Sequence, residues 1–469
     1  MSVIHSSSYE NFIQEDRIRE MIQAGAHTPG NIPLILKKAR GLEGLLPEEA
    51  AVLLGVQDPE VWLEIFRIAQ EVKERIYGNR IVVFAPLYLS NYCLNSCSYC
   101  GYHRGSGIER RKLNQAEIVE EVKILESMGH KRLAIETGED PVNCPIEYVL
   151  ESLATIYQVR HQSGNIRRVN VNVAAASVDN YRKLKAAGIG TYILFQETYH
   201  QASYEKYHPH GPKSDYFRQL TAFDRAISAG IDDIGAGVLF GLYDYRFDLI
   251  ALLCHAAYLE QKYGVGPHTV SVPRLRPARG VRIEDYPYLI SDNDLARIVA
   301  LLRIALPYTG IILSTREKPE VRRRILKLGV SQISAGSCTG VGGYSNRSQN
   351  QEADTSQFQV EDHRAPDDVY AALCRDGYLP SFCTACYRQG RTGDRFMALA
   401  KSGEIGKICT PNAILTFQEY LIDYASPGTK VAGAGQLQLS LSRIDSPALR
   451  RDVERKLERI QQGERDLYY

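Results

Sequence analysis

The sequence lacks an excess of charge of either sign. Its 469 residues contain 56 Lys and Arg against 55 Asp and Glu, so the formal net charge at pH 7 is +1. Proteins that bind nucleic acid or an anionic membrane usually carry clustered positive charge. We therefore expect no nucleic acid and no membrane among the partners, and a small molecule or another protein instead.

Long apolar stretches are also missing. Residues 1–22 mix Ser, Glu, Asp and Arg without the apolar core of a signal peptide. No later stretch reaches about 18 consecutive apolar residues, the length that predicts a transmembrane helix. The sequence therefore predicts a soluble, cytoplasmic protein.

Cysteine is too scarce for a disulfide scaffold, because the chain has only ten in 469 residues. Six of them nevertheless fall in two tight groups, and such grouping in an intracellular protein indicates metal binding or redox chemistry. The other four are assigned no role, since free cysteine often serves as a small core residue; they are Cys144, Cys254, Cys338 and Cys374.

Hydrophobic periodicity divides the chain into three regions. Residues 1–80 contain charged stretches with helical apolar spacing and predict a helical N-terminal extension. Residues 81–340 alternate short β-rich runs with stretches long enough for helices. Because parallel strands need such crossovers, this pattern predicts an α/β fold, a (β/α)8 TIM barrel. Residues 341–469 predict a mainly helical C-terminal domain.

The eight predicted strands cover residues 81–88, 132–137, 168–173, 191–196, 234–240, 269–273, 311–315 and 332–335.

Cys93, Cys97 and Cys100 form a C-x3-C-x2-C motif directly after the first predicted strand. Loops at this position form the C-terminal mouth of a barrel, where barrel active sites lie. Three thiolates at this spacing can bind three irons of a four-iron four-sulfur cluster and leave the fourth iron open for a small molecule. The alternatives are a zinc site that lacks its fourth ligand, or three structural cysteines.

This motif, with Tyr99 before its last cysteine, resembles the cluster-binding loop of the radical S-adenosylmethionine (SAM) superfamily. The resemblance implies that the open iron binds SAM and that an electron from the cluster cleaves SAM to methionine and a 5′-deoxyadenosyl radical. It also places Tyr99 in the cofactor site.

Two further segments are similar to SAM-binding elements of that superfamily. Thr137, Gly138 and Glu139, at the end of the second predicted strand, resemble its Gly-Gly-Glu segment, whose carbonyls bind the SAM amino group, although Thr137 replaces the first glycine. Gly235 and Gly237 resemble the adenine-side glycine segment after strand five, where missing side chains allow close approach. Either segment could instead be a simple turn at a strand end.

Cys383 and Cys386 form a C-x2-C pair, and Cys409 follows after 22 intervening residues. We interpret this second group as the site of another four-iron four-sulfur cluster with one open iron. A structural zinc site is the alternative, with Cys374 or His363 as the fourth ligand.

A radical SAM barrel followed by a C-x2-C-x22-C domain resembles the HydG family of tyrosine lyases, which mature the active site of FeFe-hydrogenase. The similarity extends over essentially the whole chain. It implies cleavage of L-tyrosine to p-cresol and dehydroglycine, and conversion of dehydroglycine to carbon monoxide and cyanide at the second cluster. It also implies an additional iron there, bridged by free cysteine and bound by His268, since imidazole is a reasonable ligand for such an iron. Without the resemblance, His268 would be a hydrogen-bonded turn residue.

Polar residues after two predicted strands are candidates for substrate binding. Ser314 and Arg316 resemble the carboxylate site of the tyrosine lyases, and a guanidinium group binds a carboxylate bidentately. Arg316 could instead pair with Glu317 or another acidic neighbour. Glu197 could accept a hydrogen bond from the SAM ribose or the substrate ammonium, or belong to a structural ion pair.

Three arginines, Arg274, Arg276 and Arg279, follow the sixth predicted strand. They could steer anionic intermediates toward the second cluster near His268, or form a solvated basic rim.

These motifs together predict a radical SAM lyase that supplies an Fe-CO-CN unit for assembly of the hydrogenase H-cluster. Its expected cofactors are two four-iron four-sulfur clusters and SAM. Its expected partners are L-tyrosine, free cysteine and iron at the auxiliary cluster, an electron donor, and hydrogenase maturation proteins. The alternatives are a ThiH-like tyrosine lyase that makes 2-iminoacetate for thiazole biosynthesis, and a non-catalytic iron-sulfur carrier or zinc scaffold.

Overall fold

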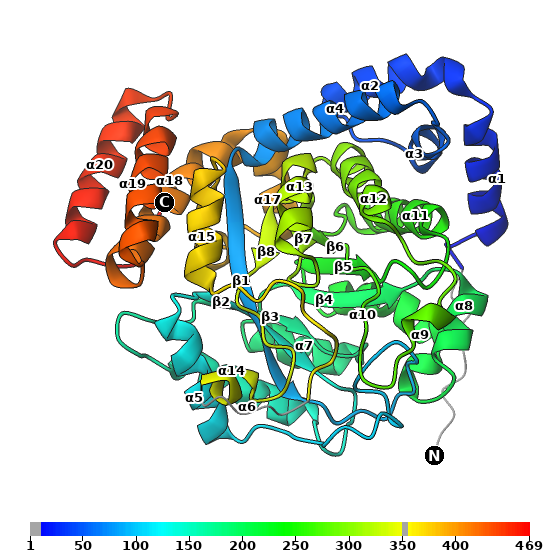
Figure 1. Cartoon of the computed structure of the whole chain (residues 1–469), viewed down its shortest axis with the longest axis horizontal. Coiled ribbons are helices and arrows are strands. Elements are labelled where there is room, and N and C mark those ends of the chain that lie inside the picture. Colours follow the sequence, from blue (N-terminus) through cyan, green and yellow to red (C-terminus); the bar gives the residue numbers. More distant parts are fainter. Residues whose placement is uncertain (1–10, 349–354) are drawn as a thin grey trace.

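Four helices precede the barrel in the computed structural model, which describes residues 11–348 and 355–469. They are α1 (Glu15–Ala26), α2 (Ile32–Arg40), α3 (Pro47–Leu54) and α4 (Pro59–Tyr77). Asp58 caps α4 by accepting a hydrogen bond from the amide of Glu60, and the buried side chains of α4 recur every three or four residues. Figure 1 shows this helical layer lying along one side of the barrel. The helical extension is confirmed, and residues 1–10 lie outside the described residues.

Eight parallel strands form the barrel: β1 (Arg80–Ser90), β2 (Arg132–Thr137), β3 (Arg168–Asn172), β4 (Tyr192–Glu197), β5 (Ile234–Val238), β6 (Thr269–Ser271), β7 (Gly310–Leu313) and β8 (Gln332–Ser334). Each pairs with the next in sequence, and β1 closes the barrel by pairing with both β8 and β2. The predicted (β/α)8 fold is therefore confirmed, with strand boundaries that differ by up to two residues.

Helices cover the outside of the strands (Figure 1). They are α5 (Gln115–Ser127), α6 (Ile146–Gln158), α7 (Val178–Ala186), α8 (Gln201–Tyr207), α9 (Tyr216–Leu220), α10 (Ala222–Ser228), α11 (Tyr245–Tyr263), α12 (Asp292–Ala305) and α13 (Pro319–Leu328). Short 3-10 turns (Pro29–Asn31, Pro212–Ser214 and Ile283–Asp285) lie in the connections.

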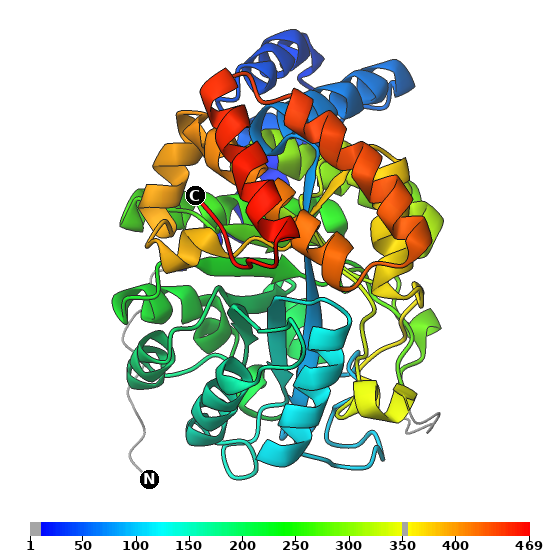
Figure 2. The ribbon, with the colours of Figure 1, turned by 90° about the vertical axis from the view of Figure 1, so that its left-hand side faces the viewer.

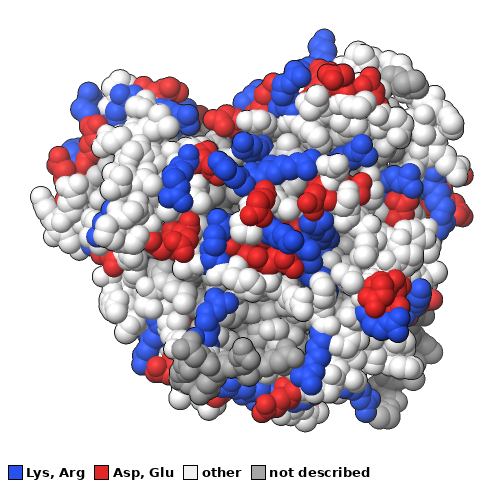
Figure 3. Space-filling view, viewed as in Figure 1, with Lys and Arg blue, Asp and Glu red and all other residues white. Residues whose placement is uncertain are grey.

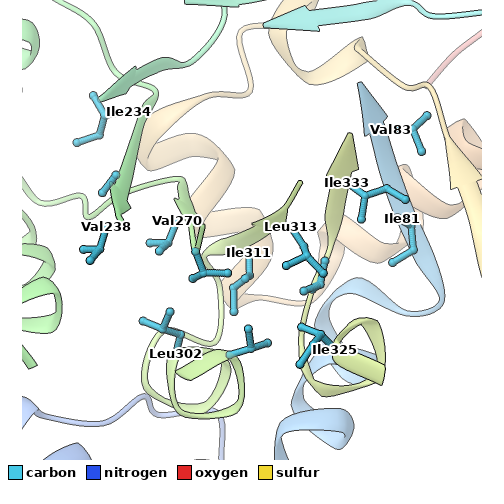
Figure 4. Close-up of a cluster of buried hydrophobic side chains, with 14 of the residues drawn as sticks. Ile81, Val83, Ile234, Val238, Val270, Leu302, Ile311, Leu313, Ile325 and Ile333 are labelled. Atoms are coloured by element: carbon cyan, nitrogen blue, oxygen red, sulfur yellow. The ribbon is translucent and has the colours of Figure 1, made fainter. Parts of the chain in front are cut away.

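Alternating side chains of the strands face opposite sides, as strand geometry requires. Figure 4 shows the outward set, in which Ile311 and Leu313 of β7 and Ile333 of β8 pack with Leu302 of α12 and Ile325 of α13. Several inward side chains are polar instead, whereas barrel interiors are usually filled by branched apolar residues. They include Arg132, Glu136, Asn172, Ser271, Gln332 and Ser334, and all of them line cavities.

The C-terminal region is mainly helical and adds a ninth strand that the sequence did not predict. Its elements are α14 (Gly343–Ser348), α15 (Pro366–Arg375), β9 (Leu379–Ser381), α16 (Ala385–Arg388), α17 (Gly393–Lys401), α18 (Glu404–Asp423), α19 (Pro427–Ser442) and α20 (Pro447–Gln461). The strand β9 pairs in parallel with Arg80–Val82 at the start of β1. Figure 2 shows α18, α19 and α20 packed beside the barrel. This pairing brings the second cysteine group to the end of the barrel where the strands begin.

The surface in Figure 3 carries basic and acidic side chains interspersed, in keeping with the formal net charge of +1. Among residues 11–348 and 355–469, no helix has both the length and the apolar character needed to span a membrane.

Candidate functional site

A cavity of about 230 Å³ opens among the carboxyl ends of the barrel strands. Cys93, Cys97 and Cys100 all line it, from the loop between β1 and α5. Tyr99 lines it too, and its hydroxyl group is hydrogen-bonded to Nε2 of His208 at 2.8 Å. The structure therefore brings the first triad together at the end of the barrel predicted for it.

Arg110 holds this loop in shape. Its guanidinium group donates hydrogen bonds to the carbonyl oxygens of Asn91 (2.6 Å), Tyr102 (2.9 Å) and His103 (2.7 Å). These carbonyls precede and follow the cysteine motif in sequence, so one side chain connects the two ends of the loop. Sequence analysis missed Arg110, because nothing in its local sequence indicates these contacts.

The thiols of the first triad are free and receive N–H donors. Asn95 Nδ2 donates to Cys93 Sγ at 3.6 Å, and Cys100 Sγ accepts from the Tyr102 amide at 3.4 Å and from Gln357 Nε2 at 3.6 Å. Burial raises the pKa of the Cys100 thiol to about 11. Donors of this kind stabilise the negative charge of cluster-bound thiolates.

No group of three or more His, Cys, Asp or Glu side chains in residues 11–348 and 355–469 is arranged to hold a single metal ion. A four-iron cluster makes a different demand, because each thiolate binds a different iron. Three cysteines that line one cavity at the mouth of the barrel fit this demand.

The Thr137–Glu139 segment lines the same cavity. A Cβ atom at Gly138 would lie 2.2 Å from the Tyr92 carbonyl oxygen, so only glycine allows the cysteine loop to approach this closely. Glu139 is fixed by an ion pair with Arg218 at 2.7 Å, and its backbone carbonyl accepts a hydrogen bond from Leu94. The segment lies beside the cysteine loop, as the resemblance implies.

Gly235 and Gly237 belong to the fifth strand of the barrel. They lie inside β5 rather than after it, and neither lines the first cavity. A Cβ atom at Gly235 would meet Thr269 Oγ1 at 2.7 Å, and one at Gly237 would meet the Phe195 ring at 2.3 Å. Side chains of neighbouring strands thus lie close to both glycines, and the role in SAM binding that the resemblance implies stays a prediction.

Arg316 and Ser314 line the first cavity, as predicted. The guanidinium group of Arg316 lies over the Phe358 ring, 3.3 Å from its centroid, and it forms no ion pair with any other described residue. Burial lowers the pKa of Arg316, although a guanidinium group stays charged. An unpaired buried cation facing a cavity is suited to bind a carboxylate.

The alternative pairing of Arg316 with Glu317 does not occur. Glu317 instead binds Arg274, with Nε–Oε1 at 3.0 Å, and Arg276, with Nη2–Oε2 at 2.7 Å. Arg274 and Arg276 thus belong to a buried ion-pair network after β6, whereas His268 lies before that strand. Arg274 and Arg276 are therefore paired at the end of β6 opposite to the end where His268 lies.

Glu197 also lines the cavity, but its carboxylate is already paired. Lys213 Nζ donates to Glu197 Oε1 at 2.6 Å, and Glu197 has a φ of +69° at an irregularity in the pairing of β4 with β5. The alternative weighed for it, a structural ion pair, is therefore present in the structure.

Glu136 is a cavity residue to which sequence analysis assigned no role. Burial raises the pKa of its carboxyl group to about 8, although a hydrogen bond from Asn172 and the charge of Arg316 act in the opposite direction. It points inward because it alternates with the outward Ile135 on β2. A carboxyl group and a guanidinium group thus share this cavity without forming an ion pair.

A second cavity of about 100 Å³ lies at the opposite end of the barrel. Residues at the starts of the strands line it, including Arg80, Arg132 and Gln332. The C-terminal region provides the rest of its wall, with Cys383, Cys386, Cys409, Tyr387, Arg391 and Phe396. The second triad and His268 therefore meet in one cavity, although His268 is more than 110 residues away in sequence.

The imidazole of His268 is available as a ligand. Its Nδ1 atom is buried and has no hydrogen-bond partner, its ring lies against Phe396 with centroids 4.3 Å apart, and burial lowers its pKa, which favours the neutral form that binds metals. Without the resemblance, His268 would be a hydrogen-bonded turn residue. That interpretation explains only its backbone amide, which donates to the carbonyl of Ile234, and not its buried Nδ1 atom.

Charge surrounds the second triad. The hydrogen bond from the Cys386 thiol, and then the nearby guanidinium groups of Arg80, Arg391 and Arg132, lower the pKa of Cys409 to about 6. Cys383 Sγ accepts a hydrogen bond from the Ala385 amide at 3.4 Å. Neither Cys374 nor His363, the proposed fourth ligands of a zinc site, lines this cavity. The residues present thus fit a cluster held by three thiolates, with His268 beside it.

Comparison with known proteins agrees with this arrangement. Residues 87–251 match the radical SAM superfamily, and residues 271–379 match the Biotin and Thiamin Synthesis associated domain. The chain is 35% identical over 313 residues to the 2-iminoacetate synthase of Escherichia coli (strain K12), covering 66% of this chain and 80% of that protein.

Two solved structures are similar over nearly the whole chain. HydG, a maturase of the [FeFe]-hydrogenase, is 56% identical with a TM-score of 0.95, covering 98% of this chain and 100% of that one. The FeFe-hydrogenase maturase HydG from Carboxydothermus hydrogenoformans is 41% identical with a TM-score of 0.83, covering 95% and 98%. The chain therefore belongs to the HydG family of radical SAM enzymes, which is related to 2-iminoacetate synthase.

Proposed function

We propose that this enzyme cleaves L-tyrosine to p-cresol and dehydroglycine at the first cavity, and converts dehydroglycine to carbon monoxide and cyanide at the second. The product is an Fe-CO-CN unit for assembly of the hydrogenase H-cluster. The observation that carries the proposal is the presence of two cavities at opposite ends of one barrel, each lined by three cysteines.

At the first cavity, Cys93, Cys97 and Cys100 would hold a four-iron four-sulfur cluster. With SAM, that cluster supplies a 5′-deoxyadenosyl radical able to remove a hydrogen atom from the substrate. Arg316 would bind the tyrosine carboxylate, with Ser314 beside it, and so orient the amino group toward the radical. The wall of the cavity would exclude water from this reaction once SAM and tyrosine fill it.

At the second cavity, Cys383, Cys386 and Cys409 would hold the auxiliary cluster. His268 would bind an additional iron that free cysteine bridges to this cluster, because its unpaired Nδ1 atom lies in the same cavity. An electron donor and the other hydrogenase maturation proteins are the expected partners, in the cytoplasm.

Product analysis of the anaerobically reconstituted protein tests the proposal. It should hold about eight irons or more, as two four-iron clusters require. With SAM, reductant and tyrosine, it should release p-cresol together with carbon monoxide and cyanide. A protein that forms no p-cresol would be a carrier or scaffold and not a lyase.

The 35% identity to a 2-iminoacetate synthase makes a thiazole-type lyase the second candidate. It predicts p-cresol without carbon monoxide or cyanide. Replacing Cys383 and Cys386 together with Ala separates the two cavities: p-cresol should persist and carbon monoxide should disappear. Equal loss of both products would show that the second triad is structural.

A further inference from the structure

A segment beyond the barrel, Thr355–Phe358, forms part of the wall of the first cavity. The amide of Gln357 donates to the Thr339 carbonyl, and the amide of Gly101, directly after Cys100, donates to the Gln357 carbonyl, both at 2.9 Å. A Cβ atom at Gly101 would lie 2.7 Å from that carbonyl oxygen. The segment is thus docked closely on the cysteine loop.

The side chain of Gln357 connects this segment to a cysteine of the first triad. Its Oε1 atom accepts a hydrogen bond from the Tyr88 hydroxyl at 2.9 Å, which turns Nε2 toward Cys100 Sγ at 3.6 Å. Tyr88 itself lies on β1 and lines the cavity. The amide is therefore oriented by a cavity residue and donates to a cysteine sulfur.

The next residue in the segment contacts the substrate side of the cavity. Phe358 lies against the guanidinium group of Arg316, 3.3 Å from ring centroid to Cζ. A carboxylate bound to Arg316 would therefore lie next to a group that contacts the residue adjacent to Gln357 in sequence. One short segment thus contacts both the carboxylate site and the cysteine loop.

We propose that Gln357 is a positioning residue that sets the reduction potential of the first cluster and makes that potential respond to substrate at Arg316. A hydrogen bond to a cluster thiolate stabilises the more negative, reduced state, so its loss makes reduction harder. This role rests on the proposed function only for the first cluster and for a carboxylate at Arg316.

The test is a redox titration without SAM, in protein that carries the Cys383→Ala and Cys386→Ala changes, so that only the first cluster titrates. Gln357→Glu keeps an acceptor for Tyr88 and removes the donor to Cys100. The matched control is Gln359→Glu, the same change at an exposed position two residues away. The first variant should titrate at a more negative potential, and the control should titrate as the parent does. Equal potentials in all three proteins would overturn the proposal.

Gln357→Glu also adds a carboxylate, which by itself makes reduction harder, so Gln357→Leu provides a second variant that removes the donor without adding charge. It should lower the ratio of reduced to oxidised cluster at a fixed potential by about two- to tenfold, the range expected for one lost neutral hydrogen bond. Equal iron content and melting temperature would establish that the fold is kept. An unchanged ratio would overturn the proposal.

The response to substrate is measured by adding tyrosine, still without SAM, so that no turnover occurs. Tyrosine should shift the potential of the parent protein and shift that of Gln357→Leu much less. Equal shifts in the two proteins would show that Gln357 does not couple the potential to the substrate, and would overturn that part of the proposal. None of these titrations requires product formation. A protein without lyase activity could therefore show the expected shifts in potential, and an active lyase could lack them, so the two proposals are tested separately.

Discussion

The two ends of the barrel each hold three cysteines, but the chain builds them in different ways. The first triad comes from one loop after β1, within eight residues of sequence. The second combines α16 and α18 with His268 and the arginines at the starts of β1 and β2. The first site therefore depends on local sequence, whereas the second depends on contacts between distant segments, among them the pairing of β9 with β1 and the hydrogen bond from Arg132 to the Cys383 carbonyl.

The electrostatic surroundings of the two triads also differ. Burial raises the pKa of Cys100 at the first end to about 11, whereas a hydrogen bond and nearby arginines lower that of Cys409 at the second end to about 6. Burial raises the pKa of Cys383 at the second end to about 11 as well, so the lowered pKa there belongs to Cys409 and not to the whole triad. Because the two cavities lie at opposite ends of the barrel and share no lining residue, we expect the two ends to respond separately to substitution.

The largest effect should follow the loss of a cysteine at the first end. We expect Cys97→Ala to abolish p-cresol, carbon monoxide and cyanide, and to lower the iron content by about half, since one of two clusters is lost. Iron analysis and product assays measure this. The control is Cys254→Ala, which changes a cysteine of α11 that lines neither cavity. Retention of p-cresol in Cys97→Ala would contradict a cluster at this end.

The next effect should be confined to the second end. His268→Ala should lower carbon monoxide and cyanide by about 100-fold or more. Loss of a group that only hydrogen-bonds a metal ligand already costs about 10- to 100-fold in metal affinity, and His268 would be a ligand itself. Formation of p-cresol should be unchanged. The matched control is the exposed His363→Ala, which also tests the zinc alternative. If His363→Ala lost iron and His268→Ala did not, His363 and not His268 would be the ligand at the second triad.

Arg316→Lys should affect the first end alone, and less severely. It keeps the charge but loses the bidentate geometry, and hydrogen bonds to charged groups contribute about 1.5–3 kcal/mol, so the KM for tyrosine should rise about 10- to 100-fold. Initial rates of p-cresol formation measure this. Arg324→Lys, an exposed position on α13, is the control. An unchanged KM would show that the carboxylate binds elsewhere.

Sequence reasoning predicted the features that depend on local pattern. The eight strands follow from apolar runs separated by long crossovers, and the two triads follow from cysteine spacing. It missed β9, which has three residues including Pro380, and so is too short and atypical to be recognised as a strand. It also missed Arg110 and Gln357, whose contacts depend on how distant segments meet; Gln357 and Cys100 are 257 residues apart.

The glycine segment shows what strand register adds to a sequence motif. Gly235-Ala-Gly237 resembles a cofactor segment, but whether a glycine faces a ligand or a neighbouring side chain depends on strand register, which one sequence does not reveal. In the structure, Phe195 and Thr269 occupy that space. Likewise, Arg274 and Arg276 after β6 pair with Glu317, a partner that becomes visible only when β6 and β7 lie side by side.

The smallest effect concerns Glu136 and the stability of the first end. Burial raises the pKa of its carboxyl group from 4.5 to about 8, so between these values the folded protein keeps a proton that the unfolded chain has released. The contribution of this group to stability is thus complete below pH 4.5 and declines as the pH rises toward 8.

In Glu136→Gln the group no longer titrates, so the melting temperature at pH 8 relative to pH 5 should be about 1–3 °C higher than in the parent. Calorimetry at the two pH values measures the difference, with Glu139→Gln as a control whose carboxylate is already paired with Arg218. If the parent and Glu136→Gln showed the same pH dependence, the carboxyl group would be ionised in the folded protein, and the first cavity would carry one more negative charge facing Arg316.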